Sequence, residues 1–324
     1  MVLFPGELEV RVNTRRLTMK FTTFLFPGQG SQYPGMFARL PDCSAVKDVF
    51  SEASDYLETD VTTLDNAEAL KTNVAIQLCL YVAAVASFRL LQAEGINPQA
   101  VAGLSVGAFA AATACGTLPY RNGLSLVKRR AELMESRYPS GYGMSVVVGL
   151  SETKIAELLK QVQIEDSQIF LSNINLPQQI TVSGANAGLS RLEELAYISG
   201  ARKIERLDVK VPSHCPLYNE EAEKLYEVLG SINLANPDIP YISNIKARPL
   251  YDSGSIAYDL AHNIAHGVRW LDTVSVLLEL GTELFVEMLP GTVLAKISRE
   301  LAPEIRSISF ENLTARSLRT FIEN

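Results

Sequence analysis

The chain has 324 residues, of which 47% are hydrophobic, enough for one large domain or two smaller ones with a sizeable core. Its formal net charge is −7. That charge argues against nucleic acid or an anionic membrane surface as a partner, because both select basic faces. The four cysteines show no C-x-x-C spacing, so neither a redox motif nor a zinc motif is indicated and we expect a reduced, cytoplasmic protein.

The first twenty residues are basic but lack the apolar core of a signal peptide. We expect either that Met19 is the natural start or that residues 1–18 are a non-essential N-terminal extension. The longest apolar stretch, residues 74–91, is interrupted by Gln77 and Arg89. It therefore predicts a buried core helix and no membrane span.

A short apolar strand is predicted at residues 23–26, followed by the glycine-rich turn Pro27-Gly28-Gln29-Gly30. A strand that ends in such a turn exposes backbone N–H groups, which can stabilise a developing oxyanion. A phosphate-binding loop is the alternative. It is disfavoured because the Walker lysine spacing and the full G-x-G-x-x-G pattern are both absent.

Residues 103–107, Gly-Leu-Ser-Val-Gly, match the pattern G-x-S-x-G. A predicted short strand precedes them and the helix-forming residues 108–114 follow, which is the context of a nucleophile elbow. The flanking glycines permit a tight turn, and Ser105 would lie at the positive end of a helix dipole. The pattern alone is also typical of an ordinary turn, so a base, an oxyanion hole and a substrate anchor must be found elsewhere.

The chain has three histidines that could supply the base. His214 lies between two prolines, in a rigid loop that could hold a general base still. His262 and His266 have the i, i+4 spacing of a metal pair, but the H-E-x-x-H pattern is absent, so contacts with helix-end carbonyls are the expected role and no metal is expected. Cys215 beside His214 is an alternative nucleophile, although Ser105 explains the chemistry better.

The order of predicted elements indicates an α/β fold. Residues 20–137 alternate strands and helices, as in a parallel sheet. After a turn-rich boundary at residues 138–143, a β-α-β-β-α-β order follows, with strands at 144–149, 169–173, 179–183 and 203–211 and helices at 151–160 and 187–198; this is the ferredoxin-like pattern. The rest returns to α/β order, with helices at 216–229, 258–266, 270–280 and 293–300 and strands at 239–244 and 283–287.

We therefore expect an α/β-hydrolase-like large domain, formed by residues 19–138 and 214–324, that contains a parallel sheet and the nucleophile elbow. An inserted ferredoxin-like small domain would comprise residues 139–213. His214 falls where the chain returns to the large domain, so the active site is expected in the cleft between the two domains.

Four blocks of sequence carry a family resemblance. Residues 26–32 (Phe-Pro-Gly-Gln-Gly-Ser-Gln), residues 103–107, Arg130, and residues 211–214 (Val-Pro-Ser-His) resemble, in order and spacing, the malonyl-CoA:acyl carrier protein transacylases. The resemblance extends over about residues 24–301. Four separate blocks in register are far more specific than any one of them.

The resemblance implies a role for each matching residue. Ser105 would be the nucleophile and His214 the general base, with the main-chain carbonyl of Asn263 orienting the histidine. The backbone N–H groups of Gln29 and Val106 would form the oxyanion hole. Arg130, which from sequence alone is one of three basic residues on a helix face, would bind the free carboxylate of malonyl.

A finer resemblance rests on Leu104, which stands where most transacylases of fatty acid synthesis have His. Residues 103–112 and 264–270 resemble the epsilon subunit of malonate decarboxylase. That resemblance implies malonyl-CoA as substrate, no bound cofactor, and as acceptor a carrier subunit bearing a phosphoribosyl-dephospho-CoA group. The alternatives are a transacylase of fatty acid or polyketide synthesis, a serine esterase or thioesterase, and a non-catalytic assembly subunit.

Overall fold

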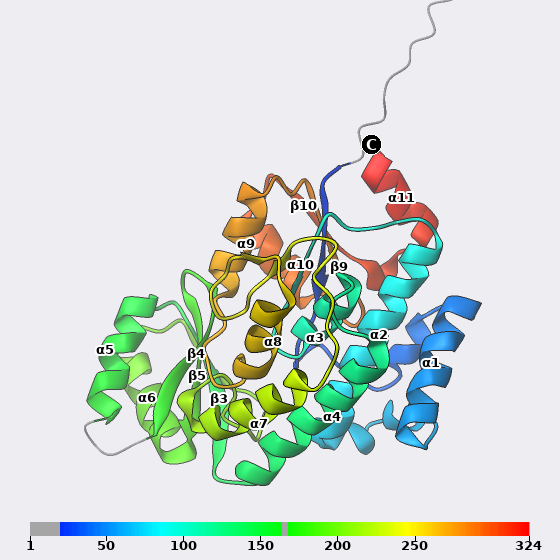
Figure 1. Cartoon of the computed structure of the whole chain (residues 1–324). Helices are drawn as coiled ribbons and strands as arrows, with labels where there is room; N and C mark the ends of the chain where they lie inside the picture. The colour runs from blue at the N-terminus through cyan, green and yellow to red at the C-terminus, as the bar shows by residue number, and fades with distance from the viewer. Residues whose placement is uncertain (1–19, 164–167, 324) are drawn as a thin grey trace, which may run out of the picture.

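The computed structural model describes residues 20–163 and 168–323, so the expected extension at residues 1–18 lies outside the described residues. Two sheets organise the described chain (Figure 1). The large sheet has six strands in the order β10-β9-β1-β2-β7-β8. Its parallel strands are β1 (Thr22–Phe26), β2 (Ala100–Gly103), β7 (Tyr241–Ile242), β9 (Leu284–Glu287) and β10 (Arg306–Ser309), and β8 (Pro249–Leu250) is antiparallel at one edge.

Helices cover both faces of the large sheet. Successive strand residues point to opposite faces, and each face packs with helices in its own hydrophobic cluster. Phe24 and Phe26 of β1 pack with residues of one set of helices, whereas Leu25 belongs to the other cluster. The first set comprises α1 (Ser44–Leu57), α2 (Asn73–Ala93), α3 (Gly107–Ala114), α4 (Tyr120–Arg137), α7 (Asn219–Gly230), α8 (Ser253–His262) and α11 (Ala315–Glu323). The second comprises α9 (Trp270–Glu279) and α10 (Val293–Leu301).

The second sheet has four antiparallel strands in the order β4-β5-β3-β6. Along the chain these are β3 (Tyr142–Val148), α5 (Glu152–Gln163), β4 (Ile169–Leu176), β5 (Gln179–Ala185), α6 (Asn186–Ile198) and β6 (Lys203–Arg206), which is the expected β-α-β-β-α-β order. Buried apolar residues of α5 and α6 pack on this sheet. The green segments of Figure 1 show this sheet and its two helices gathered at one side of the molecule.

Short 3₁₀ helices complete the described elements. They span Met36–Arg39, Val61–Leu64, Ala69–Lys71, Pro216–Tyr218 and Phe310–Asn312.

Helix α2 is long and apolar enough to cross a membrane by length and composition alone. It lies buried within the fold, as the sequence predicted for a core helix. Two polar residues in its middle, Gln77 and Ser87, are fully buried.

The structure corrects three expected elements. Strand β6 ends at Arg206 and not at residue 211, because the chain leaves the sheet after Leu207 and lines a cavity instead. The strand expected at 239–244 is reduced to Tyr241–Ile242, since the next two residues bond to a buried carboxylate. The helix expected at 258–266 spans Ser253–His262, because Asp252 caps its start by accepting a hydrogen bond from the Ser255 N–H.

Candidate active site

The G-x-S-x-G motif joins β2 to α3 in a tight turn. Ser105 has a left-handed backbone with φ of 56°. A Cβ added to Gly103 would lie 2.1 Å from the carbonyl oxygen of Gly107, and one added to Gly107 would lie 2.2 Å from that of Phe26. Neither distance is possible for a real side chain. Both positions therefore require glycine because the backbone packs closely there, and not because of an unusual torsion angle.

Ser105 and His214 are joined by a hydrogen bond although they are far apart in the sequence. The Nε2 atom of His214 lies 2.8 Å from Ser105 Oγ, and its Nδ1 atom lies 2.6 Å from the carbonyl oxygen of Asn263. Because a carbonyl can only accept, the proton lies on Nδ1. Nε2 is then free to accept the serine proton.

Burial and charge keep the His214 ring neutral. The residue is only 3% exposed, and burial, with the nearby Arg130 charge as the second cause, lowers the pKa of His214 to about 3. The ring therefore carries no charge at neutral pH and can act as a proton acceptor.

Arg130 of α4 lies beside this pair and is 1% exposed. Its Nη1 donates to Gln77 Oε1 at 2.6 Å, and its Nη2 donates to Ser105 Oγ at 3.1 Å and to Asn263 Oδ1 at 3.4 Å. Burial lowers the pKa of Arg130 to about 9, so the guanidinium still carries its charge at neutral pH. Within residues 20–163 and 168–323 no carboxylate forms an ion pair with it, and its Nε has no acceptor.

Such a buried cation is costly without an anionic partner, and a bound carboxylate would offset that cost. The side chain of Asn263 offers a further donor, since its Nδ2 is buried and has no partner among the described residues. The site is therefore built to receive negative charge next to the serine hydroxyl.

Two backbone N–H groups, of Gln29 in the glycine-rich turn and of Val106 in the elbow, are candidates for an oxyanion hole. The Leu104 N–H donates to Phe26 O at 2.9 Å, and a Cβ on Gly28 would lie 2.6 Å from Leu104 O. The elbow is thus packed against the turn that contains Gln29. Among the described residues, neither the Gln29 N–H nor the Val106 N–H has a protein acceptor, which leaves both available to an oxyanion.

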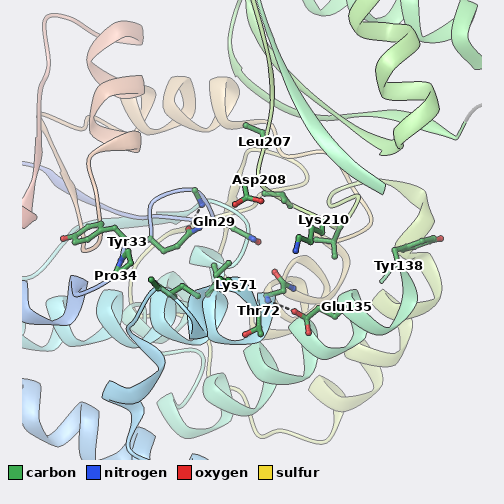
Figure 2. A pocket seen from close by; sticks show the side chains of 18 of the residues that line it. Gln29, Tyr33, Pro34, Lys71, Thr72, Glu135, Tyr138, Leu207, Asp208 and Lys210 are labelled. Carbon is green, nitrogen blue, oxygen red and sulfur yellow. Dashed lines mark hydrogen bonds between the residues drawn. The ribbon is translucent and has the colours of Figure 1, made fainter. Parts of the chain in front are cut away.

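A cavity of about 850 Å³ opens beside the site (Figure 2). Gln29 and the residues 207–211 that precede His214 form part of its lining. Figure 2 shows Lys210 and Asp208 on one side of the hollow and Lys71 and Glu135 on the other. Ser105, His214 and Arg130 are not part of this lining, so the cavity lies beside these three residues and does not contain them.

The remaining sequence candidates have structural partners. His262 Nδ1 lies 2.9 Å from Tyr258 O, and His266 Nδ1 lies 3.0 Å from His262 O, which are the expected carbonyl contacts. Cys215 is buried and its thiol donates to Pro212 O. In the part of the chain that the structure describes, no group of three or more His, Cys, Asp or Glu side chains could hold a metal.

Three buried polar residues were not identified as site residues from the sequence. Gln77 holds the Arg130 guanidinium, Asn244 bonds to the backbone of the elbow, and Asp259 bonds to Asn244. Gln77 had a signal, since it interrupts an otherwise apolar helix. Asn244 and Asp259 had no such sequence signal. Asn244 is 139 residues from its partner Ser105, and Asp259 is 15 residues from its partner Asn244.

Comparison with known proteins assigns the chain to a family. The acyl transferase domain family matches residues 23–315, which shows that the chain belongs to the acyl transferase family. A malonyl CoA-acyl carrier protein transacylase of Bacillus subtilis (strain 168) is 32% identical over 296 residues, covering 90% of this chain and 93% of the relative. Within the family, the resemblance to malonyl-CoA:acyl carrier protein transacylases is thereby confirmed.

Solved structures show the same relationship. FabD from Acinetobacter baumannii is 32% identical with a TM-score of 0.89, covering 94% of this chain and 98% of that one. A malonyl-transacylase in complex with its type II PKS acyl-carrier protein is 31% identical with a TM-score of 0.88, covering 94% of this chain and 99% of that one. The mixed α/β architecture with a parallel sheet is therefore that of the transacylases.

Proposed function

We propose that this protein transfers malonyl from malonyl-CoA to the thiol of an acyl carrier protein through a malonyl-serine intermediate. One observation carries the proposal. Arg130 is a buried cation with no anionic partner among the described residues, and its Nη2 lies 3.1 Å from Ser105 Oγ. A carboxylate at this place would lie close to an acyl group on the serine, which is the arrangement of a malonyl ester.

The chemistry follows from the hydrogen bonds. Ser105 Oγ attacks the thioester carbonyl while His214 Nε2 takes its proton. The tetrahedral oxyanion accepts hydrogen bonds from the Gln29 and Val106 N–H groups, each worth roughly 3 kcal/mol in the transition state. Collapse breaks the carbon–sulfur bond, and His214 returns the proton to the departing CoA thiol. The carrier thiol then attacks the malonyl-serine by the same steps in reverse.

Asn263 supports this cycle without adding charge. Its carbonyl oxygen accepts from His214 Nδ1, where a serine hydrolase commonly uses an aspartate. A neutral acceptor fixes the tautomer and places no negative charge beside an anionic acyl group.

The cavity beside Gln29 would hold the thioester arm of the substrate. Its volume of about 850 Å³ lies within the range of small-molecule sites. Lys71 and Lys210 are in its lining and could pair with phosphate groups, whereas the chain as a whole is acidic. No bound cofactor enters the proposed reaction, and we place the protein in the cytoplasm.

We further propose that the acceptor is the carrier subunit of malonate decarboxylase, with its phosphoribosyl-dephospho-CoA group. Leu104 supports this finer assignment, since it replaces the usual histidine and its side chain is buried in an apolar cluster with Val268 and Trp270. A carrier of fatty acid or polyketide synthesis is the alternative. Comparing the two carriers as acceptors of the same malonyl-enzyme distinguishes them.

We also propose the domain division expected from the sequence. The strand order β4-β5-β3-β6 and its two helices support a ferredoxin-like unit at residues 139–213. The parallel sheet with the serine turn after β2 supports an α/β-hydrolase-like unit formed by residues 19–138 and 214–324.

Intact-protein mass spectrometry after brief incubation with malonyl-CoA or acetyl-CoA tests the proposed activity. We expect a malonyl adduct on the wild type, none on Ser105→Ala, and little acetyl adduct. Release of free malonate without an adduct would indicate a hydrolase. Neither adduct nor turnover would refute the proposed chemistry.

A further inference from the structure

The side-chain amide of Asn244 forms hydrogen bonds with the backbone of the turn that contains Ser105. Asn244 follows the short strand β7, and its side chain is 3% exposed. Its Oδ1 accepts from the Ser105 N–H at 2.9 Å, and its Nδ2 donates to Gly103 O at 2.8 Å. One planar amide therefore bonds to the backbone on both sides of Leu104, directly at the residue whose φ is 56°.

Asn244 is in turn fixed by a buried carboxylate. Asp259 of α8 is 2% exposed, and its Oδ2 accepts from the Asn244 N–H at 3.1 Å and from Tyr241 Oη at 2.8 Å. Its Oδ1 accepts from the Ile245 N–H at 3.2 Å and from the Ser243 hydroxyl. Four donors from the end of β7 converge on one side chain. Such a fully satisfied network specifies a single arrangement.

The helix that carries Asp259 also reaches the base. The Asn263 N–H donates to Asp259 O at 3.0 Å, and Asn263 O accepts from His214 Nδ1 at 2.6 Å. Helix α8 is thus a common support for both members of the pair. Its Asp259 side chain fixes the strand end that holds Ser105, and the residue after its C-terminus orients His214.

We propose that Asn244 and Asp259 are positioning residues for acyl transfer, which hold Ser105 in its left-handed conformation and at hydrogen-bonding distance from His214. Neither side chain touches the acyl group. This inference rests on the proposed function, because it requires that Ser105 be acylated. Its effect should fall on the rate of acylation and not on substrate affinity, since Arg130 and the cavity are not altered.

The test measures the rate of malonyl-serine formation by rapid-quench mass spectrometry. We expect Asn244→Ala to lower the maximal acylation rate about 100-fold, because a small misplacement of a reacting atom has an effect of that order. The malonyl-CoA concentration at half-maximal rate should change less than about threefold. Asp259→Asn replaces one carboxylate oxygen with an NH₂ group, which faces hydrogen-bond donors of residues 241–245 and cannot accept from them. This variant should lower the rate at least about tenfold.

Asn244→Asp separates positioning from a general loss of stability. Its protonated carboxyl has the shape of the amide, with one acceptor for the Ser105 N–H and one donor for Gly103 O. Its ionised form places an oxygen against Gly103 O and beside the Asp259 carboxylate. We therefore expect slow acylation at pH 8 that recovers as the pH is lowered to about 5.5, whereas the wild-type rate stays flat because of the low His214 pKa.

Asn236→Ala is the matched control. The exposed Asn236 side chain also accepts a hydrogen bond from a backbone N–H, that of Ser253 at the start of the same helix α8, and among the described residues it forms no hydrogen bond with residues 103–107. It should acylate like the wild type. A variant of Asn244 or Asp259 that acylates within twofold of wild type overturns the inference for that residue, as does a flat pH profile of Asn244→Asp. If Asn244→Ala does not fold, the Asn244→Asp profile decides. Absence of an adduct on the wild type would instead refute the proposed function.

Discussion

Ser105 and His214 share an unusual backbone conformation as well as a hydrogen bond. Their φ angles are 56° and 63°, and their Oγ and Nε2 atoms are 2.8 Å apart. A left-handed conformation costs a residue with a side chain about 1–2 kcal/mol. A backbone hydrogen bond holds each residue. The Ser105 N–H donates to Asn244 Oδ1, and the His214 N–H donates to Ile264 O. The proposed nucleophile and base therefore both occupy strained positions that surrounding groups maintain.

The strain at Ser105 predicts a stability difference between two inactive variants. Ser105→Gly removes the penalty of a Cβ at positive φ, whereas Ser105→Ala keeps it. We expect the glycine variant to be more stable than the alanine variant by about 0.5–1 kcal/mol, after the greater chain entropy of glycine is subtracted. Urea unfolding of both proteins checks this, and an alanine variant of equal or greater stability would contradict it.

The glycines of the elbow predict a large loss of stability on substitution. A Cβ at residue 107 would lie 2.2 Å from Phe26 O, a backbone atom that cannot turn away. We expect Gly107→Ala to lower the free energy of unfolding by about 3 kcal/mol and to abolish acylation.

Gly230 provides the matched control for that substitution. It is exposed in α7, and apart from its chain neighbours and the backbone of its own helix no atom lies within 4 Å of its added Cβ. Gly230→Ala should change the free energy of unfolding by less than about 1 kcal/mol and leave acylation intact. Equal effects of the two substitutions would contradict the packing argument.

Removing the charge of Arg130 should change the acyl selectivity of the enzyme. Charge-assisted hydrogen bonds are each worth about 1.5–3 kcal/mol, so Arg130→Met should lower kcat/KM for malonyl-CoA by about 100-fold. Acetyl-CoA, which has no carboxylate, should react at least as well as before. Arg129→Met, which alters the exposed neighbour on the same helix, should leave both substrates unchanged. Initial rates with both thioesters measure the ratio, and an unaltered ratio would exclude Arg130 as the carboxylate-binding residue.

The two shifted pKa values predict the pH profile. His214, with a pKa of about 3, stays unprotonated through neutral pH, so kcat/KM should show no step near 6.5. Arg130, with a pKa of about 9, loses its charge above that pH, and kcat/KM for malonyl-CoA should then fall about tenfold per unit. Acetyl-CoA should not show this alkaline fall. A malonyl profile with a step near 6.5 would contradict the burial of the histidine.

The same His214 shift has a consequence for stability. Between pH 6.5 and about 3 the unfolded chain binds a proton at this site that the folded chain does not. The contribution of the neutral His214 ring to the free energy of unfolding is therefore fully present above pH 6.5, and it is lost as the pH falls toward 3. Unfolding of wild type and His214→Ala at pH 7.5 and 4.5 should show a smaller difference at the lower pH.

Much of the fold could be predicted because its signals are local. The apolar run at residues 74–91, the glycine spacing at 103–107 and the β-α-β-β-α-β order each depend on neighbouring residues, and the structure contains α2, the turn before α3 and the four-stranded sheet accordingly. The ends of strands and helices were less predictable where they depend on contacts with side chains that are distant in the sequence. Strand β7 is short because Asp259 binds the residues after it.

The site was predictable only in part for a similar reason. The motif around Ser105 and the rigid loop of His214 are visible in the sequence, but the choice of Arg130 among three basic neighbours needed the family register. Its burial beside Gln77 depends on how α2 and α4 pack, which no local pattern encodes. Asn244 and Asp259 could not be identified at all, since an asparagine after a strand and an acid on a helix usually face solvent.

The distance along the chain between Ser105 and His214 affects how the protein is made. The two residues are 109 positions apart, and the four-stranded sheet lies between them. During synthesis the serine leaves the ribosome well before the histidine and before α8, which supports both. A nascent or truncated chain thus contains the proposed nucleophile without its proposed proton acceptor. Under the proposed mechanism, we expect reactivity toward thioesters only after the part of the chain that contains His214 and α8 has folded against Ser105.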